Sequence, residues 1–274
     1  MSVTTSSSRL ASDRQRAIYY SALAEHHPDA PFWQPRTCFR SPTLAVWETV
    51  ASFARAADAL LAGNQDEAVL HIGKAERADI LAWGIPVMST VDPKIIRWRP
   101  IDESTLPEQG RVGSPKPGPK LLDAMYRRDG WRCRFCGSPV IVPEARTRIG
   151  ELLPGAFRWT NAHGDHAGFE ILSGVADHVQ PHSWSGPTSL DNLVSCCAPC
   201  NYGRGPAFLD EMGLIDPRTR EPYPADGWDG LTRVLAIPAP RKPAGPVLPP
   251  SPNMTVWAQF ARLVKVREES RVER

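Results

Sequence analysis

Two C-x-x-C pairs constrain the fold of this chain more than any other feature of its sequence. The first pair is Cys133 and Cys136, and the second is Cys197 and Cys200. Each pair supplies two sulfur ligands from one tight turn, and two such turns complete the tetrahedral coordination of structural zinc. In a reducing compartment, paired cysteines of this kind are typical of metal sites rather than disulfides. The sequence therefore predicts a structural Zn²⁺ ion held by four thiolates.

Two further cysteines fall outside this pattern. Cys196 directly precedes Cys197, but only Cys197 has the x-x spacing to Cys200. We therefore expect Cys196 to be a buried strand thiol and Cys38 to be a lone core residue.

Polar residues that suit hydrolytic chemistry lie between and beside the two pairs. Asp177 and His178 are consecutive, Asn192 precedes Leu-Val, and Asn201 directly follows Cys200. An imidazole next to a carboxylate, held near a tetrahedral metal knuckle, is the basis of a hydrolytic metal site.

The order C-x-x-C, D-H-x-x-P, N-L-V and C-x-x-C-N resembles the HNH endonuclease family, over about residues 121–205. The resemblance implies a ββα-metal finger in which His178 is the general base and Asn192 braces the loop that orients it. It also implies that Asp177 and Asn201 hold the catalytic ion. Asn stands here where many members carry His, and an amide oxygen favours Mg²⁺ or Mn²⁺.

Each of these residues also has a simpler interpretation. Asp177 and His178 would also suit a capped turn, Asn201 would also suit a helix cap, and Asn192 is mainly structural in either reading. The placement of Asp177 and His178 between the two cysteine pairs favours catalysis.

The charge distribution indicates phosphate contacts around the turn that carries Cys133 and Cys136. The net charge is only +2, but residues 111–150 hold nine Lys or Arg against three Asp or Glu. Such a segment attracts phosphates, although a solvated face is the alternative. We expect Arg132, Arg134, His182 and Arg204 to contact nucleic acid. For His182, a hydrogen bond within its loop is an equal alternative.

The expected fold class is α+β: a helical N-terminal region, a small zinc-stapled ββα-metal domain and a C-terminal helix. The expected divisions are residues 1–100 (helical region), 101–120 (linker), 121–235 (nuclease domain with a packing extension), 236–252 (Pro-rich linker) and 253–274 (helix). The N-terminus has no apolar core typical of a signal peptide, and no apolar run approaches the roughly 18 residues that span a bilayer. We expect a cytoplasmic protein without membrane contact.

Helices are expected in the N-terminal region at residues 12–24, 41–62 and 64–84. Ser41 and Pro42 are a good N-cap and first position. Asn64 with Glu67 forms a capping box, and Gly84 ends that helix.

Within the nuclease domain we expect a helix at 120–128, strands at 169–179 and 193–196, and a helix from 199 to about 202. Residues 138–172 form a long insertion, which we interpret as a surface hairpin with a polar tip. A second metal site built from His163, Asp165 and His166 is the alternative.

These features predict a metal-dependent endonuclease that hydrolyses DNA phosphodiester bonds. The alternative is a catalytically silent, zinc-stapled module that binds nucleic acid or protein. A role in bacterial restriction or anti-phage defence rests on family analogy alone. The N-terminal and C-terminal helices are expected to dock a protein partner.

Overall fold

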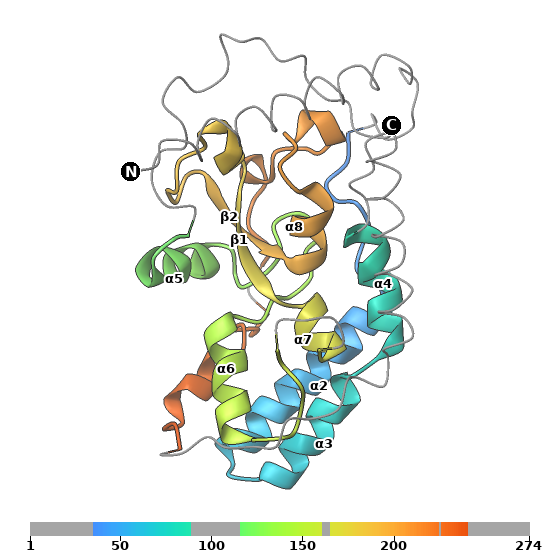
Figure 1. Cartoon of the computed structure of the whole chain (residues 1–274), viewed down its shortest axis with the longest axis vertical. Helices are drawn as coiled ribbons and strands as arrows, with labels where there is room; N and C mark the ends of the chain where they lie inside the picture. Colours follow the sequence, from blue (N-terminus) through green and yellow to red (C-terminus); the bar gives the residue numbers. More distant parts are fainter. Residues whose placement is uncertain (1–34, 89–115, 161–164, 225, 241–274) are drawn as a thin grey trace, which may run out of the picture.

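The computed structural model describes residues 35–88, 116–160, 165–224 and 226–240 (Figure 1). The helices expected at 12–24 and 253–274, and most of the linkers expected at 101–120 and 236–252, lie outside these residues. The elements in chain order are α2 (Leu44–Leu61), α3 (Gln65–Ala75), α4 (Ala78–Met88), α5 (Pro119–Arg128), α6 (Pro143–Leu152), α7 (Ala167–Ile171), β1 (Gly174–His178), η3 (His182–Trp184), β2 (Leu193–Cys197), α8 (Ala198–Arg204), η4 (Asp210–Met212), η5 (Pro217–Thr219) and η6 (Thr232–Ala236).

The fold is α+β, as predicted. Its sheet is one antiparallel pair in which Gly174 lies opposite Cys197 and His178 lies opposite Leu193. Helix α8 follows β2 directly, so the order β1, β2, α8 is a ββα unit. No helix among the described residues has both the length and the apolar character needed to cross a membrane.

Helices α2 and α3 form an antiparallel hairpin, and local capping explains its turn. The Glu67 backbone N–H donates to Asn64 Oδ1 at 3.2 Å, while Asn64 Nδ2 donates to Glu67 Oε2 at 2.9 Å, so the predicted cap at Asn64 is confirmed. The predicted start at Ser41 is wrong, because Thr43 is the N-cap of α2. The Ser41 carbonyl instead accepts a hydrogen bond from Trp83 Nε1 at 2.8 Å.

The prediction of a single helix at 64–84 is wrong, because the structure has two helices there, α3 and α4. Glu76 leaves the helical conformation with ψ near 89°, and its carboxylate accepts a hydrogen bond from Ala167 N at 2.7 Å. Gly84 does not end a helix but lies buried within α4. A Cβ there would lie 2.5 Å from Ile171 Cδ1, so this glycine lets α4 approach α7.

The insertion at 138–172 is not a surface hairpin. It contains α6 and α7, and α7 covers part of the stretch that we expected to begin the first strand. Phe169 is fully buried beside Phe53 and Phe157, with ring centroids 4.4 and 4.5 Å away. The His166 side chain caps this turn by accepting a hydrogen bond from Phe169 N at 3.3 Å, so the chain is helical from Ala167 and not extended.

One hydrophobic core joins the N-terminal helices to the ββα unit. Phe53 and Ile72 from the hairpin belong to the same buried cluster as Phe135, Phe169 and Leu193. Helix α4 packs against α8 and α7, and η6 packs against α6. The helical region is thus a support for the ββα unit in the described structure, and the predicted domain boundaries stay a prediction.

Candidate metal centre and catalytic site

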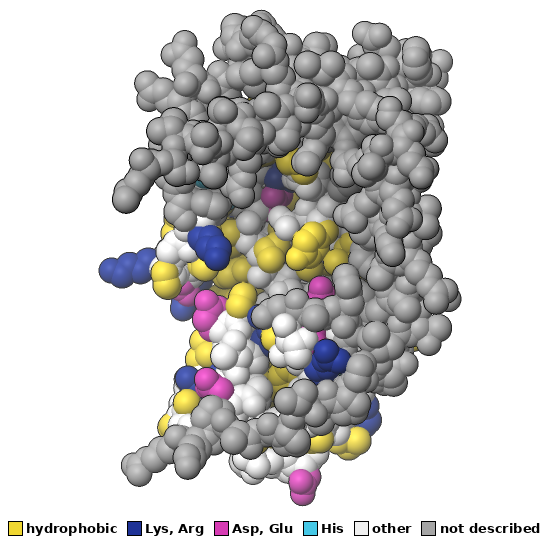
Figure 2. All heavy atoms as spheres, viewed as in Figure 1, with side chains coloured by type: hydrophobic (Ala, Val, Ile, Leu, Met, Phe, Trp, Pro, Cys, Tyr) yellow, Lys and Arg dark blue, Asp and Glu magenta, His cyan; other side chains and the backbone are white. Residues whose placement is uncertain are grey.

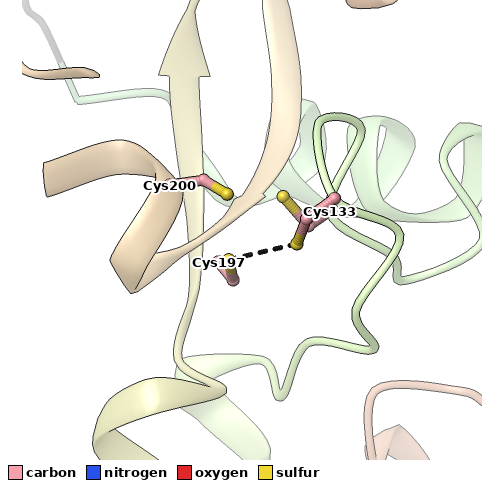
Figure 3. Close-up of side chains that lie close together, drawn as sticks. Cys133, Cys197 and Cys200 are labelled. Atoms are coloured by element: carbon pink, nitrogen blue, oxygen red, sulfur yellow. Dashed lines mark hydrogen bonds between the residues drawn. The ribbon is translucent and has the colours of Figure 1, made fainter. Parts of the chain in front are cut away.

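Four cysteine side chains converge at one end of the sheet. Cys133 and Cys136 come from the loop after α5, Cys197 ends β2, and Cys200 lies in the first turn of α8. All four are buried, and their sulfur atoms all lie within 4.8 Å of one another. Figure 3 shows Cys133, Cys197 and Cys200 pointing toward a common centre. The predicted cluster is confirmed as a group that could hold zinc.

The chemistry of these thiols fits a bound cation. Burial raises the pKa of the Cys136 and Cys197 thiols well above the ordinary value. Their thiolate forms therefore need a positive partner, and Zn²⁺ coordinated by thiolates supplies it. Four sulfur ligands leave no open position, which is typical of a structural ion.

Cys196 lies against this group without belonging to it. Its sulfur is 4.0 Å from Cys133 Sγ and donates to the Cys197 carbonyl at 3.4 Å. It is fully buried in β2, as expected for a strand thiol. Cys38 is partly buried against the core.

The sheet places Asp177 and His178 at the end of β1 that leads into the loop 180–191. Asp177 pairs with Val194 and His178 pairs with Leu193. Neighbouring residues on a strand point to opposite faces, so the carboxylate and the imidazole lie on different sides of the same short strand.

Asn192 fixes the loop between the strands. Its Oδ1 accepts from Gln180 N at 2.8 Å, and its Nδ2 donates to the carbonyls of Gln180 and Pro187 at 3.0 and 2.9 Å. Gly186 closes the same loop, because a Cβ there would lie 1.9 Å from the Gln180 carbonyl oxygen. This geometry agrees with the predicted bracing role, which is a matter of structure rather than of proton transfer.

The His178 imidazole lies where β1 ends and this loop begins, and it contacts a residue of the loop. Its Nε2 lies 3.0 Å from Thr188 Oγ1, and its ring centroid lies 5.5 Å from that of His182. Burial lowers the pKa of His178, and the nearby His182 and Arg204 lower it further. The imidazole is therefore neutral at neutral pH and able to accept a proton.

Asp177 is paired with an arginine, a contact that the sequence did not suggest. Arg204 Nε donates to Asp177 Oδ2 at 2.8 Å, and Arg204 Nη2 donates to Asp177 Oδ1. Burial raises the pKa of the Asp177 carboxyl, and the Arg204 guanidinium opposes that rise. Because Arg204 contacts both carboxylate oxygens, the geometry is that of an ionised carboxylate paired with a guanidinium.

Asn201 lies on the helix that carries this arginine. It is three residues before Arg204 in α8, and residues three apart share one face of a helix. Arg204 contacts Asp177 on β1, and Asn201 precedes it by about one helical turn. The donor types, one carboxylate and one amide, suit a hard divalent ion.

The residues expected to bind nucleic acid are mostly turned inward. Arg132 donates to the Gly137 carbonyl at 2.8 Å and pairs with Asp226. Arg134 donates to the Pro217 carbonyl at 2.5 Å. These two arginines and Arg204 are all buried, so none presents its guanidinium to a phosphate in this structure.

His182 is half-buried, and its Nε2 is itself buried, with no hydrogen-bond partner among the described residues. Figure 2 shows Lys and Arg at separate places among the described side chains of the drawn face, not gathered in one basic surface. The predicted contacts with nucleic acid stay predictions.

The alternative second metal site is not formed by the residues that the structure describes. His166 caps α7, with Nδ1 accepting from Phe169 N at 3.3 Å and Nε2 lying 3.0 Å from the Ile72 carbonyl oxygen. The Asp165 carboxylate accepts from Thr160 N and Oγ1 at 2.7 and 2.9 Å. His163 lies outside the described residues.

Comparison with known proteins identifies the segment that carries this site. Residues 170–206 match a family model described as HNH endonuclease. The match begins just before β1 and ends just after α8, so it spans the ββα unit and includes Cys197 and Cys200. No curated protein and no solved structure matches the chain.

Proposed function

We propose, from the match of residues 170–206 to the HNH endonuclease family model, that this protein is a metal-dependent endonuclease that hydrolyses phosphodiester bonds of DNA. An HNH domain implies a nucleic-acid substrate and suggests nuclease activity. The observation that carries the proposal is the position of Asp177 and His178 on β1, joined through β2 and α8 to four converging cysteines.

In this proposal His178 is the general base. Its burial keeps the imidazole neutral, and a neutral imidazole within reach of a water molecule accepts the proton that the attacking oxygen loses. Such a base typically contributes about 10²–10⁴-fold to the rate. Asn192 contributes indirectly, because it holds the backbone on both sides of the loop that follows His178.

Asp177 and Asn201 are proposed to hold the catalytic Mg²⁺ or Mn²⁺. When bound, such an ion acts as a Lewis acid at the phosphate and at the leaving oxygen. The four cysteines are proposed to hold Zn²⁺, which ties the loop after α5 to the start of α8.

In this proposal the zinc-bound cysteines take no part in the reaction itself. They hold α8, and with it Asn201, against β1. His182 is proposed to contact the phosphate from the loop that follows His178. Because its Nε2 is buried and without a partner among the described residues, this contact requires the imidazole to turn outward.

The test is cleavage of a supercoiled plasmid in Mg²⁺ or Mn²⁺ by the full chain and by His178→Ala. We expect His178→Ala to cut at least 10²-fold more slowly. His71→Gln is the matched control, because it changes a histidine of α3, and it should cut at the parent rate. Zinc content and circular dichroism of each variant establish that it is folded.

A catalytically silent module is the second candidate, and one observation favours it. The Asp177 carboxylate is buried and already paired with Arg204, so the carboxylate proposed to hold the ion is already occupied by a guanidinium. Absence of cutting by the parent protein with either ion, or equal cutting by His178→Ala, would refute the nuclease. Cytoplasmic location and a protein partner belong to the same proposal, and so does a role in bacterial restriction or anti-phage defence, which rests on family analogy.

A further inference from the structure

The Arg204 guanidinium already supplies positive charge to Asp177. Both carboxylate oxygens accept hydrogen bonds from it, and the two side chains are only 2% and 5% exposed. The same guanidinium donates to the carbonyls of His178 and Ala207 at 2.6 and 2.8 Å. It is therefore held in place by the ends of β1 and α8, and not by Asp177 alone.

This pairing leaves the carboxylate and the guanidinium together without net charge before any ion arrives. Among the described residues, the cysteine cluster is the one group of three or more Cys, His, Asp or Glu ligands close enough to share an ion, so Asp177 has no such set around it. The amide of Asn201 adds no charge. One carboxylate whose charge is already balanced is a poor site for a divalent cation.

The size of this effect follows from Coulomb's law. A divalent ion that shares the carboxylate is repelled by the buried guanidinium. At an effective dielectric constant of about 20, that repulsion lowers affinity more than about tenfold at any separation below about 10 Å. A phosphate group of a nucleic acid carries negative charge that would offset this repulsion.

We propose that Arg204 keeps the Asp177–Asn201 site in a state of low affinity for divalent ions until a nucleic-acid phosphate binds. This inference rests on the proposed function and adds its regulation: the phosphate supplies the negative charge that the neutral pair lacks, so ion and substrate bind cooperatively. Because such coupling is reciprocal, the ion must strengthen DNA binding by the same factor that DNA strengthens ion binding.

A purely structural role for Arg204 predicts the opposite change in ion affinity when the guanidinium is removed. If the guanidinium only orients Asp177 for the ion, then removing it should weaken ion binding. If it competes with the ion, removing its charge should strengthen ion binding. The affinity for the ion in the absence of DNA separates the two.

The experiment measures Mn²⁺ affinity from the electron paramagnetic resonance signal of free Mn²⁺, with zinc-loaded protein. All proteins carry His178→Ala, so that a duplex oligonucleotide stays intact. The variants are Arg204→Met, which removes the charge at similar volume, Arg204→Lys, which keeps the charge, and Asp177→Asn, which removes the proposed ligand. Each is measured with and without duplex DNA.

We expect the His178→Ala parent to bind Mn²⁺ at least tenfold more tightly with DNA than without it. Arg204→Met should bind Mn²⁺ at least tenfold more tightly than the parent without DNA, and DNA should then add little. Arg204→Lys should resemble the parent, and Asp177→Asn should lose the binding.

Equal or weaker Mn²⁺ binding by folded Arg204→Met overturns the inference. If Arg204→Met does not fold, the parent alone decides, because Mn²⁺ binding that is equally tight with and without DNA also overturns it. Failure of the proposed function is distinct: the active protein does not cut, or Mn²⁺ binding does not depend on Asp177.

Discussion

The loop between β1 and β2, which follows His178 and carries His182, depends on a glycine that admits no side chain, and Gly186→Ala tests this directly. A Cβ at this position would lie 1.9 Å from the Gln180 carbonyl oxygen and 2.9 Å from Asn192 Nδ2. Both atoms belong to the brace of the loop, and Gly186 N also donates to the Pro181 carbonyl at 3.1 Å. The added methyl group must therefore push the loop open or break the brace.

The expected loss of stability combines two effects. Overpacking a tight site costs about 1–3 kcal/mol, and leaving a buried amide without its partner costs about 1–3 kcal/mol. We therefore expect Gly186→Ala to lower the free energy of unfolding by about 2–6 kcal/mol. Because the loop also carries His182 and orients His178, the cleavage rate should fall with it.

The assay is urea unfolding at saturating zinc, followed by circular dichroism, together with plasmid cleavage. Gly73→Ala is the matched control, since a Cβ there meets nothing within 4 Å on an exposed position of α3. It should be neutral or stabilising by up to about 1 kcal/mol, because alanine favours helix. If Gly186→Ala unfolds within about 0.5 kcal/mol of the parent, the bracing argument fails.

Two other predictions concern the metal and the pH. Cys200→Ser should lose zinc and most of its stability, because structural zinc contributes on the order of 10 kcal/mol to folding. Cys196→Ala should keep a full equivalent of zinc by elemental analysis. Loss of zinc from Cys196→Ala would refute the assignment of four cysteine ligands. Burial lowers the pKa of His166, so the unfolded state binds its proton more readily; stability is then complete above about pH 6.5 and is lost as the pH falls below it. His166→Asn keeps a helix-capping oxygen, and unfolding measured between pH 7 and pH 5 should show a shallower loss than in the parent; an unchanged slope would contradict this role.

The cysteine cluster shows why part of the site could be predicted without coordinates. A C-x-x-C pair places two sulfurs in one turn whatever the rest of the chain does, so its chemistry is local. The same holds for Asn64, whose side chain caps the helix that begins at the next residue. Both predictions depend on spacing within a few residues, and both are confirmed.

The helix boundaries show where sequence patterns are insufficient. Residues 64–84 have a helical pattern, yet the helix stops because Glu76 turns away to bind the backbone of Ala167. Gly84 suggested a helix end, but its missing side chain makes room for Ile171. In each case the deciding partner lies far along the chain, where local patterns carry no information.

The sequence by itself determined the chemistry of this protein: four thiols in two turns, and an adjacent carboxylate and imidazole between them. These follow from residue type and short spacing. Only the tertiary structure decided which charges face one another. It turned Arg132 and Arg134 inward and placed Arg204 on Asp177, because ion pairing across a fold depends on how β1 and α8 pack and not on their order in the chain.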